Sequence, residues 1–431
     1  MNVRHKNKWP DQTQIAREGM DHIVGGECTA AKQGSSSSNP ASDDEPSVTA
    51  EPEKLNAWLQ AVDLEFNPFA PLEAGADSRL STYLVGHDAF AALWGDWPAF
   101  LFAPAGGGKS AFRVRLAYAC RAGEDGRRVF PILYHLPRGQ MSLDAHLHAI
   151  GRAAAHELLL ELAWRPGQFE ALDMEARCEI RRVFSWNVPG LLDHFLPQLQ
   201  EDGSPMPIVQ AFDPSAVHLP NPPAPARVRA LCDALRSLPA ATDASPPPKE
   251  RFKHLLHVLF SLLKRQAVYI LVDSIDAHPE TIHAPETATE WLRPLIDHFP
   301  VWAEQRVFPK LFLPEELDDF LKQDTLNYLT PQIKSAKIEW TPERLAEMLQ
   351  ARVRVASGGE FNSLDAVSSP ALHRVEETLI AEVSTPRELL ELAERVLLQH
   401  VRLAGPTGLL EPEDLEATIA LFTSQNRNTE P

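Results

Sequence analysis

The sequence predicts an α/β protein in which helices flank a parallel sheet, with a helical insertion in mid-chain and a helical region at the C-terminus. Residues 97–102 and 268–273 are short apolar runs, which are typical of buried central strands. A glycine-rich loop and a helical pattern follow the first run, and an amphipathic segment, 252–263, precedes the second. Strands that alternate with helices indicate a parallel sheet.

The N-terminal residues 1–52 are predicted to form a disordered tail. A serine run at 35–38 and an acidic stretch at 43–45 leave too little apolar surface to offset the entropy of ordering the chain. A short helix is expected to follow at 53–62.

The glycine-rich loop at 103–110 has the composition of a phosphate-binding loop. It fits the pattern small-x-x-x-x-Gly-Lys-Ser/Thr, with Ala103 where glycine usually opens the motif. Consecutive glycines let backbone N–H groups turn inward around a triphosphate. We expect Lys109 to reach the β- and γ-phosphates and the Ser110 hydroxyl to ligate Mg²⁺. The predicted nucleotide contacts in this loop are Ala105, Gly106, Gly107, Gly108, Lys109 and Ser110.

The segments on either side of this loop favour a nucleotide site. The alternative is a glycine-rich turn in which the lysine has no function. The apolar strand precedes the loop, and residues 110–122 follow it as a helix whose N-terminal dipole attracts phosphate. Strand, loop and helix in this order predict a P-loop NTPase fold. A second strand is expected at 129–136.

Residues 138–250 are predicted to form an inserted module, because in a compact core far fewer residues would separate the strand at 129–136 from the strand at 268–273. The first part has helical periodicity, and 204–248 contains many prolines. The module is either a contact surface for a partner or a structural buttress. Three histidines lie in one helix of it, but they lack a convincing further ligand, so a metal site is not predicted. They are His146, His148 and His156.

An acidic pair follows the strand at 268–273 and predicts the second half of the site. Asp273 ends the strand, where it would hold Mg²⁺ beside the loop, so the predicted metal contacts are Ser110 and Asp273. Asp276 would polarise the attacking water. The alternatives are that Asp273 is a plain strand-end residue and that Asp276 caps the following turn.

Together with the loop and the acidic pair, residues 84–88 resemble AAA+-type ATPases, and the nearest match is the signal-transduction branch known as STAND. In that branch an apolar-apolar-Gly-Arg-Glu segment borders the adenine, which implies that Gly86 contacts the nucleotide. His87 and Asp88 replace the Arg and Glu. Ala277 stands where the acidic motif of that branch usually ends in glutamate.

The resemblance continues at 384–390, which is similar to the start of the AAA+ lid helix that carries the second sensor arginine. It implies that Arg387 touches the γ-phosphate and takes part in catalysis. The alternative is that Pro386 occupies the first helical turn and Arg387 is solvated. Residues 310–314 are similar to the strand of the first sensor, although no Asn, Ser or Thr ends it.

These patterns divide the chain after its tail into four segments. Residues 53–137 and 251–335 form the P-loop nucleotide-binding core, 138–250 the helical and proline-rich insertion, and 336–425 an α-helical lid. Helices are expected in the lid near 342–355, 370–382, 386–404 and 412–422.

Composition restricts the class of protein. With 41 basic and 59 acidic residues, the chain has a net charge of −18. This negative charge argues against non-specific binding of nucleic acid by the chain as a whole. Four scattered cysteines suit a reducing compartment, and no apolar run is long enough to span a membrane, so a cytoplasmic protein is expected. A local basic patch remains open at Arg113, Arg115, Arg121, Arg127 and Arg128.

The predicted function is an ATPase, with ATP and Mg²⁺ as cofactors, that switches a conformation or an assembly. Its output would lie in self-association or in a separate effector protein. One alternative is a nucleotide-gated scaffold with little hydrolysis, which the missing first-sensor residue favours. Another is a DNA-directed AAA+ regulator.

Overall fold

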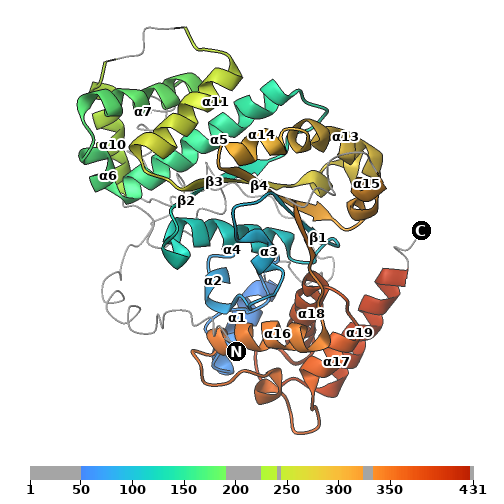
Figure 1. Cartoon of the computed structure of the whole chain (residues 1–431). Coiled ribbons are helices and arrows are strands. Elements are labelled where there is room, and N and C mark those ends of the chain that lie inside the picture. Colours follow the sequence, from blue (N-terminus) through green and yellow to red (C-terminus); the bar gives the residue numbers. More distant parts are fainter. Residues whose placement is uncertain (1–49, 191–224, 240–243, 324–332, 428–431) are drawn as a thin grey trace, which may run out of the picture. The chain divides into compact units, whose positions relative to one another are not determined.

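The computed structural model describes residues 50–190, 225–239, 244–323 and 333–427 (Figure 1). They all lie within one compact unit, Val48–Pro431. The tail predicted at 1–52 falls outside the described residues except at its end, where helix α1 begins at Ala50. Residues 191–224 of the predicted insertion also fall outside them.

A five-stranded sheet with the order β2-β3-β4-β1-β5 forms the centre of the fold, and every pair of neighbours is parallel. This confirms the predicted α/β class with a parallel sheet flanked by helices. The strands are β1 Ala99–Ala103, β2 Val129–His135, β3 Ala267–Asp273, β4 Val307–Pro314 and β5 Lys334–Lys337.

Strands β1 to β4 are mostly apolar because both faces of the sheet are covered. Phe100 and Phe102 of β1 belong to the core on one face, while Leu101 and Ala103 belong to the core on the other. The period of two in a strand produces this division.

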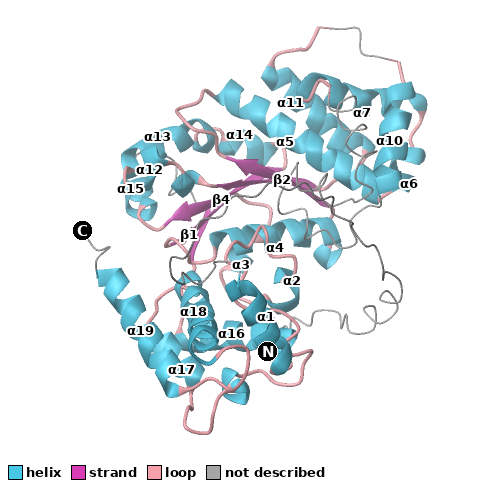
Figure 2. Ribbon diagram, turned by 180° about the vertical axis from the view of Figure 1, so that it is seen from behind, coloured by secondary structure: helices cyan, strands magenta, loops and turns pink. Residues whose placement is uncertain are grey.

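Helices cover both faces of the sheet (Figures 1 and 2). On one side lie α4 Lys109–Ala122 and the short α3 Phe90–Leu93. On the other lie α5 Leu143–Trp164, α11 Pro248–His257, α13 Pro285–Ile296 and α14 Phe299–Glu304. The shorter helices are α2 Leu80–Tyr83, α6 Pro166–Glu170, α12 Pro279–Ile282 and α15 Leu317–Gln323, with turns at Glu124–Gly126, Val258–Leu262, Ile275–Ala277 and Leu364–Val367.

The described helices of the insertion share a core with the sheet. Leu147, Ile150 and Leu158 of α5 pack with Phe130 and Ile132 of β2. Two further helices, α7 Met174–Asn187 and α10 Pro225–Ser237, pack against this layer. This continuous core favours the interpretation of the insertion as a buttress.

Helices α16 Pro342–Ala356, α17 Val375–Ala381, α18 Pro386–Ala404 and α19 Pro412–Arg427 surround a second core, which we call the C-terminal cluster. Helix α1, Ala50–Ala61, belongs to this cluster, although the sequence suggested that residues 53–137 lie in the core with the sheet. The Trp58 side chain is completely buried there, and its indole N–H donates to the Gly408 carbonyl at 3.0 Å. Phe69 is also buried in this core.

Strand β4 contains a lysine in the middle of the sheet. The Lys310 side chain is fully buried, and Nζ donates to the carbonyl oxygens of Gly95 at 2.9 Å and Trp97 at 2.6 Å. The ammonium group also lies 4.5 Å from the centre of the Tyr269 ring. Burial lowers the pKa of Lys310 well below its ordinary value.

No helix in the described ranges is long and apolar enough to cross a membrane.

His146 packs inside the helical layer beside β2. Its ring is 1% exposed, and Nδ1 lies 2.6 Å from the Tyr134 hydroxyl oxygen. Burial disfavours the charged imidazolium and lowers the pKa of His146 to about 4.

This shift predicts a loss of stability in acid. The unfolded chain binds the proton near pH 6.5 and the folded chain only near pH 4. The stability that comes from burying neutral His146 is therefore fully present above about pH 6.5. As the pH falls to about 4, the free energy of unfolding decreases by about 3 kcal/mol. Urea unfolding across this range should give a flatter pH dependence for His146→Leu than for the wild type. Substitution of the exposed His257 by asparagine is the control, and equal slopes in all three proteins would contradict the assignment.

Candidate functional site

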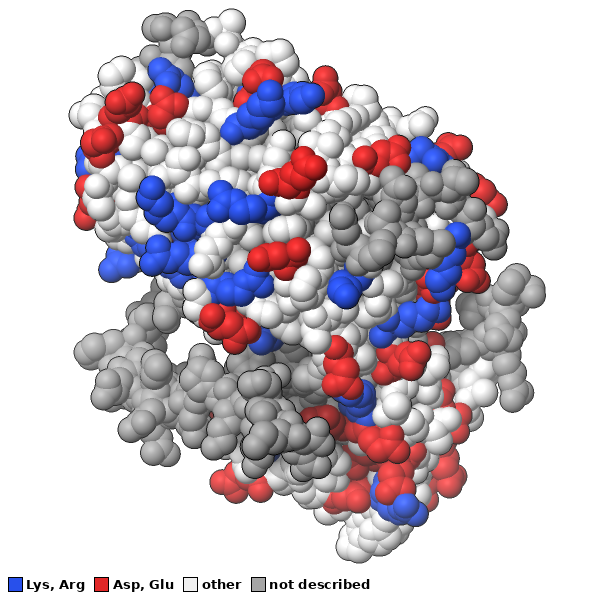
Figure 3. Space-filling model, in the orientation of Figure 1, with Lys and Arg blue, Asp and Glu red and all other residues white. Residues whose placement is uncertain are grey.

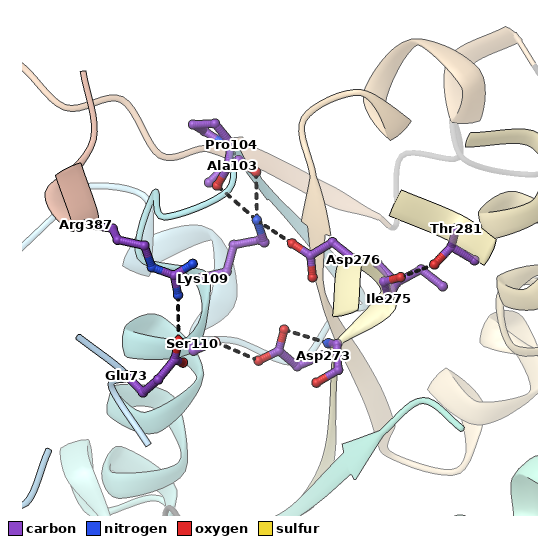
Figure 4. A network of polar contacts seen from close by, with 11 residues as sticks. Glu73, Ala103, Pro104, Lys109, Ser110, Asp273, Ile275, Asp276, Thr281 and Arg387 are labelled. Atoms are coloured by element: carbon purple, nitrogen blue, oxygen red, sulfur yellow. Dashed lines mark hydrogen bonds and ion pairs between the residues drawn. The ribbon is translucent and has the colours of Figure 1, made fainter. Parts of the chain in front are cut away.

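Four of the predicted site residues meet where the carboxyl ends of β1 and β3 face the start of α4 (Figure 4). Lys109 and Ser110 open α4, Asp273 ends β3, and Asp276 lies in the turn Ile275–Ala277. Lys109 Nζ lies 2.9 Å from Asp276 Oδ2. The Ser110 hydroxyl donates to Asp273 Oδ2 at 3.1 Å. The fold therefore brings together four side chains from two distant parts of the sequence.

The loop before α4 requires glycine for two separate reasons. Gly106 and Gly108 have φ values of +75° and +95°, a region that side chains disfavour. A Cβ at Gly107 would lie 3.0 Å from both the Ala103 Cβ and the Pro104 carbonyl oxygen. The backbone can thus make this tight turn only with small residues.

Backbone carbonyl groups of the loop hold the Lys109 side chain in place. Its side chain is 7% exposed, and Nζ donates to the carbonyl oxygens of Ala103 and Pro104, each at 3.0 Å. With Asp276 as the third partner, all three donors of the ammonium group are engaged. The positive charge lies beside the N-terminus of α4, where the helix dipole adds to it.

The oxygen atoms at the end of β3 suit a hard divalent cation. Ser110 supplies a hydroxyl and Asp273 a carboxylate, which are ligand types that Mg²⁺ prefers. The other carboxylate oxygen, Asp273 Oδ1, accepts from the Ser274 backbone N–H at 2.8 Å. Ser274 has a φ of +76°, so the chain turns sharply just after the strand.

Arg113 also contacts this carboxylate, which the sequence interpretation missed. Its Nε lies 3.2 Å from Asp273 Oδ2, and Nη1 lies 3.0 Å from His135 Nε2. His135 Nδ1 lies 3.1 Å from the Ser274 hydroxyl oxygen. The spacing of three from Ser110 puts Arg113 on the same face of α4, and that was the only sequence signal for the contact.

The start of α18 lies against the glycine-rich loop that precedes α4. The Arg387 backbone N–H donates to the Gly106 carbonyl at 3.4 Å, and a Cβ at Gly106 would lie 2.8 Å from the Arg387 Cβ. The Arg387 guanidinium is directed to Glu73, with Nη2 2.8 Å from Oε1 (Figure 4). Thr385 caps α18 in a capping box with Glu388.

Residues 84–88, which were compared with the adenine border, contact α16 and the residues just before that helix. Arg344 donates to the Gly86 carbonyl at 2.9 Å and pairs with Asp88 at 2.8 Å. His87 Nε2 lies 3.1 Å from the Glu339 carbonyl oxygen. Gly86 itself is exposed, and an added Cβ there would meet nothing within 4 Å.

Trp340 joins this segment to the loop and is a second residue that the sequence interpretation missed. Its indole N–H donates to the Gly107 carbonyl at 3.0 Å. The His87 ring lies 5.9 Å from the Trp340 ring and 5.4 Å, edge-on, from the Phe112 ring. An aromatic surface therefore adjoins the loop on the side of residues 84–88.

Strand β4 reaches the same edge of the sheet without a polar side chain. Pro314 ends the strand opposite Ala103 of β1. The next residue, Glu315, pairs with Lys337 at 3.1 Å. The amide or hydroxyl side chain of a first sensor has no counterpart at the end of β4.

Comparison of the chain with protein-family models, with curated proteins and with solved structures gave no match.

Proposed function

We propose that this chain binds ATP with Mg²⁺ and hydrolyses it, and that the cycle switches a conformation or an assembly in the manner of AAA+ and STAND ATPases. The observation that carries the proposal is the convergence of Lys109 and Ser110 with Asp273 and Asp276 at one edge of a parallel sheet. Nucleotides bind to α/β sheets at the carboxyl ends of the strands.

Each side chain has a distinct role in this proposal. Lys109 exchanges its contact with Asp276 for the β- and γ-phosphates, while backbone N–H groups at the start of α4 bind phosphate oxygens. Ser110 and Asp273 would hold Mg²⁺, which would supply positive charge to the phosphates. Asp276, a quarter exposed, then accepts a hydrogen bond from the attacking water.

The C-terminal cluster is proposed to act as a lid over the nucleotide. Contacts from Arg387 to Gly106 and from Trp340 to Gly107 support this role, because they join the cluster to the loop itself. Arg387 would exchange Glu73 for the γ-phosphate. Trp340 and His87 offer rings on which a base can stack.

A nucleotide-gated scaffold with little hydrolysis is the second candidate. It is favoured by the end of β4, where Pro314 offers no polar side chain to the phosphates. In this candidate the protein would hold ATP as a structural ligand and release it slowly.

The two candidates are separated by single-turnover hydrolysis of radiolabelled ATP with the protein in excess. We expect all bound ATP to be converted to ADP in Mg²⁺ and no conversion after the metal is removed with EDTA. ATP that binds and stays intact would favour the scaffold. Failure to bind ATP in any condition would refute both candidates.

Ion pairs engage four of the five arginines of the predicted basic patch, which weighs against the DNA-directed alternative. Arg113 pairs with Asp273, and Arg115 with Glu124. The partners of Arg121 and Arg127 are Glu157 and Asp96. On the face shown in Figure 3, acidic side chains predominate over the C-terminal cluster.

A further inference from the structure

Arg113 lies where the proposed cation site is formed. The Arg113 side chain is 6% exposed and the Asp273 side chain 5% exposed, so water screens their attraction poorly. Arg113 Nε and the Ser110 hydroxyl approach the same carboxylate oxygen, Asp273 Oδ2, at 3.2 and 3.1 Å. The charge of this carboxylate is therefore balanced by the protein itself.

A second strand holds the guanidinium in place. His135 ends β2 and lies directly opposite Asp273 in the register with β3. Its Nε2 lies 3.0 Å from Arg113 Nη1, and its Nδ1 lies 3.1 Å from the Ser274 hydroxyl oxygen. Arg113 is thus fixed from α4, β2 and β3 together, and a change of rotamer would leave Asp273 buried without its cation.

A fixed guanidinium reduces the electrostatic attraction between Asp273 and a divalent cation. An isolated aspartate offers a charge of −1 to Mg²⁺, whereas the Asp273–Arg113 pair is neutral. The guanidinium also repels a second cation, and it does so strongly in a poorly hydrated site. Arg115, two residues along the same helix, pairs instead with Glu124 at 2.8 Å.

We propose that Arg113 is a built-in counter-ion of Asp273, so that ATP binding by this protein depends little on Mg²⁺. This inference rests on the proposed function, since it concerns the same nucleotide site. Mg²⁺ then acts mainly in hydrolysis, and the protein takes up nucleotide whether or not the metal accompanies it. Arg113 is a positioning residue in this account, because it acts through Asp273.

The test is the dissociation constant of ATP measured by calorimetry in Mg²⁺ and again in EDTA. For the wild type we expect the two constants to agree within about threefold. For Arg113→Met we expect binding in EDTA to be at least about tenfold weaker than in Mg²⁺, because Asp273 then repels the phosphates unless a cation is present. Arg115→Met is the matched control and should behave as the wild type does.

A second variant guards against misfolding of Arg113→Met, which leaves a buried carboxylate unpaired. Arg113→Lys keeps the positive charge, so its binding should remain nearly independent of Mg²⁺. A strong dependence on Mg²⁺ in Arg113→Lys would overturn the proposal, because charge would then not be the cause.

The wild-type measurement is decisive by itself. Binding of ATP that requires Mg²⁺ overturns this inference and leaves the proposed function standing. Absence of ATP binding in both Mg²⁺ and EDTA overturns the inference together with the proposed function.

Discussion

Lys109→Ala is expected to abolish ATP hydrolysis and to weaken ATP binding at least about 100-fold. The ammonium group is held 3.0 Å from the carbonyl oxygens of Ala103 and Pro104, directly over the loop that would receive the phosphates. A hydrogen bond to a charged group contributes about 1.5–3 kcal/mol, and alanine removes such bonds to two phosphates. Hydrolysis and ATP affinity, measured on the purified variant, check this.

The control for Lys109→Ala must separate lost binding from lost folding, since the side chain is buried. Thermal unfolding without nucleotide shows whether the variant is folded. Lys253→Ala removes an exposed lysine that pairs with Glu250 in α11, and it should leave ATP hydrolysis unchanged. Equal hydrolysis by the wild type and Lys109→Ala would contradict the proposed ATPase site.

Asp276→Asn is expected to slow ATP turnover at least about 100-fold without weakening ATP binding. Asparagine has the same shape but is a much weaker acceptor for a proton from the attacking water. It also removes the ion pair of 2.9 Å with Lys109, which ATP must otherwise displace. Binding should therefore be equal or tighter, and separate measurement of kcat and of the ATP dissociation constant tests both parts.

A matched substitution at Asp297, an exposed aspartate just after α13, should change neither quantity. If Asp276→Asn loses ATP binding, the carboxylate serves to position Lys109 and does not act on water. If turnover is unchanged, Asp276 only belongs to the turn after β3.

Sequence reasoning succeeded where a local pattern determines the structure. The apolar runs at 97–102 and 268–273 have the length and composition of buried strands, and parallel strands bring their carboxyl ends to one edge. The juxtaposition of Ser110 and Asp273 follows from that geometry. The glycine requirement follows equally from the tight loop.

Strand β5 could not be predicted, because its four residues, Lys334–Lys337, contain no apolar run. It is an edge strand that is held by backbone hydrogen bonds to β1, and almost any side chain permits such bonds. The position of Trp340 depends on β5, so its contact with Gly107 was equally hidden.

The contact between Arg113 and His135 depends on tertiary register. His135 reaches Arg113 only because β2 and β3 pair with His135 opposite Asp273. No property of either residue alone reports that pairing, so the sequence indicated Arg113 only as a member of the local basic patch. The partner of Arg387 was unpredictable for the same reason, since Glu73 lies 314 positions away in sequence.

The packing of α1 in the C-terminal cluster determines the order in which the chain can fold. During synthesis α1 leaves the ribosome long before α16 and α18, so Trp58 and Leu59 lack their native partners until the last helices emerge. Closing so long a segment is entropically slow compared with forming the local contacts of the sheet layer. The edge of the sheet at the carboxyl ends of β1 and β3 can thus form first. A polypeptide that stops before α16 would expose apolar side chains that chaperones and proteases recognise.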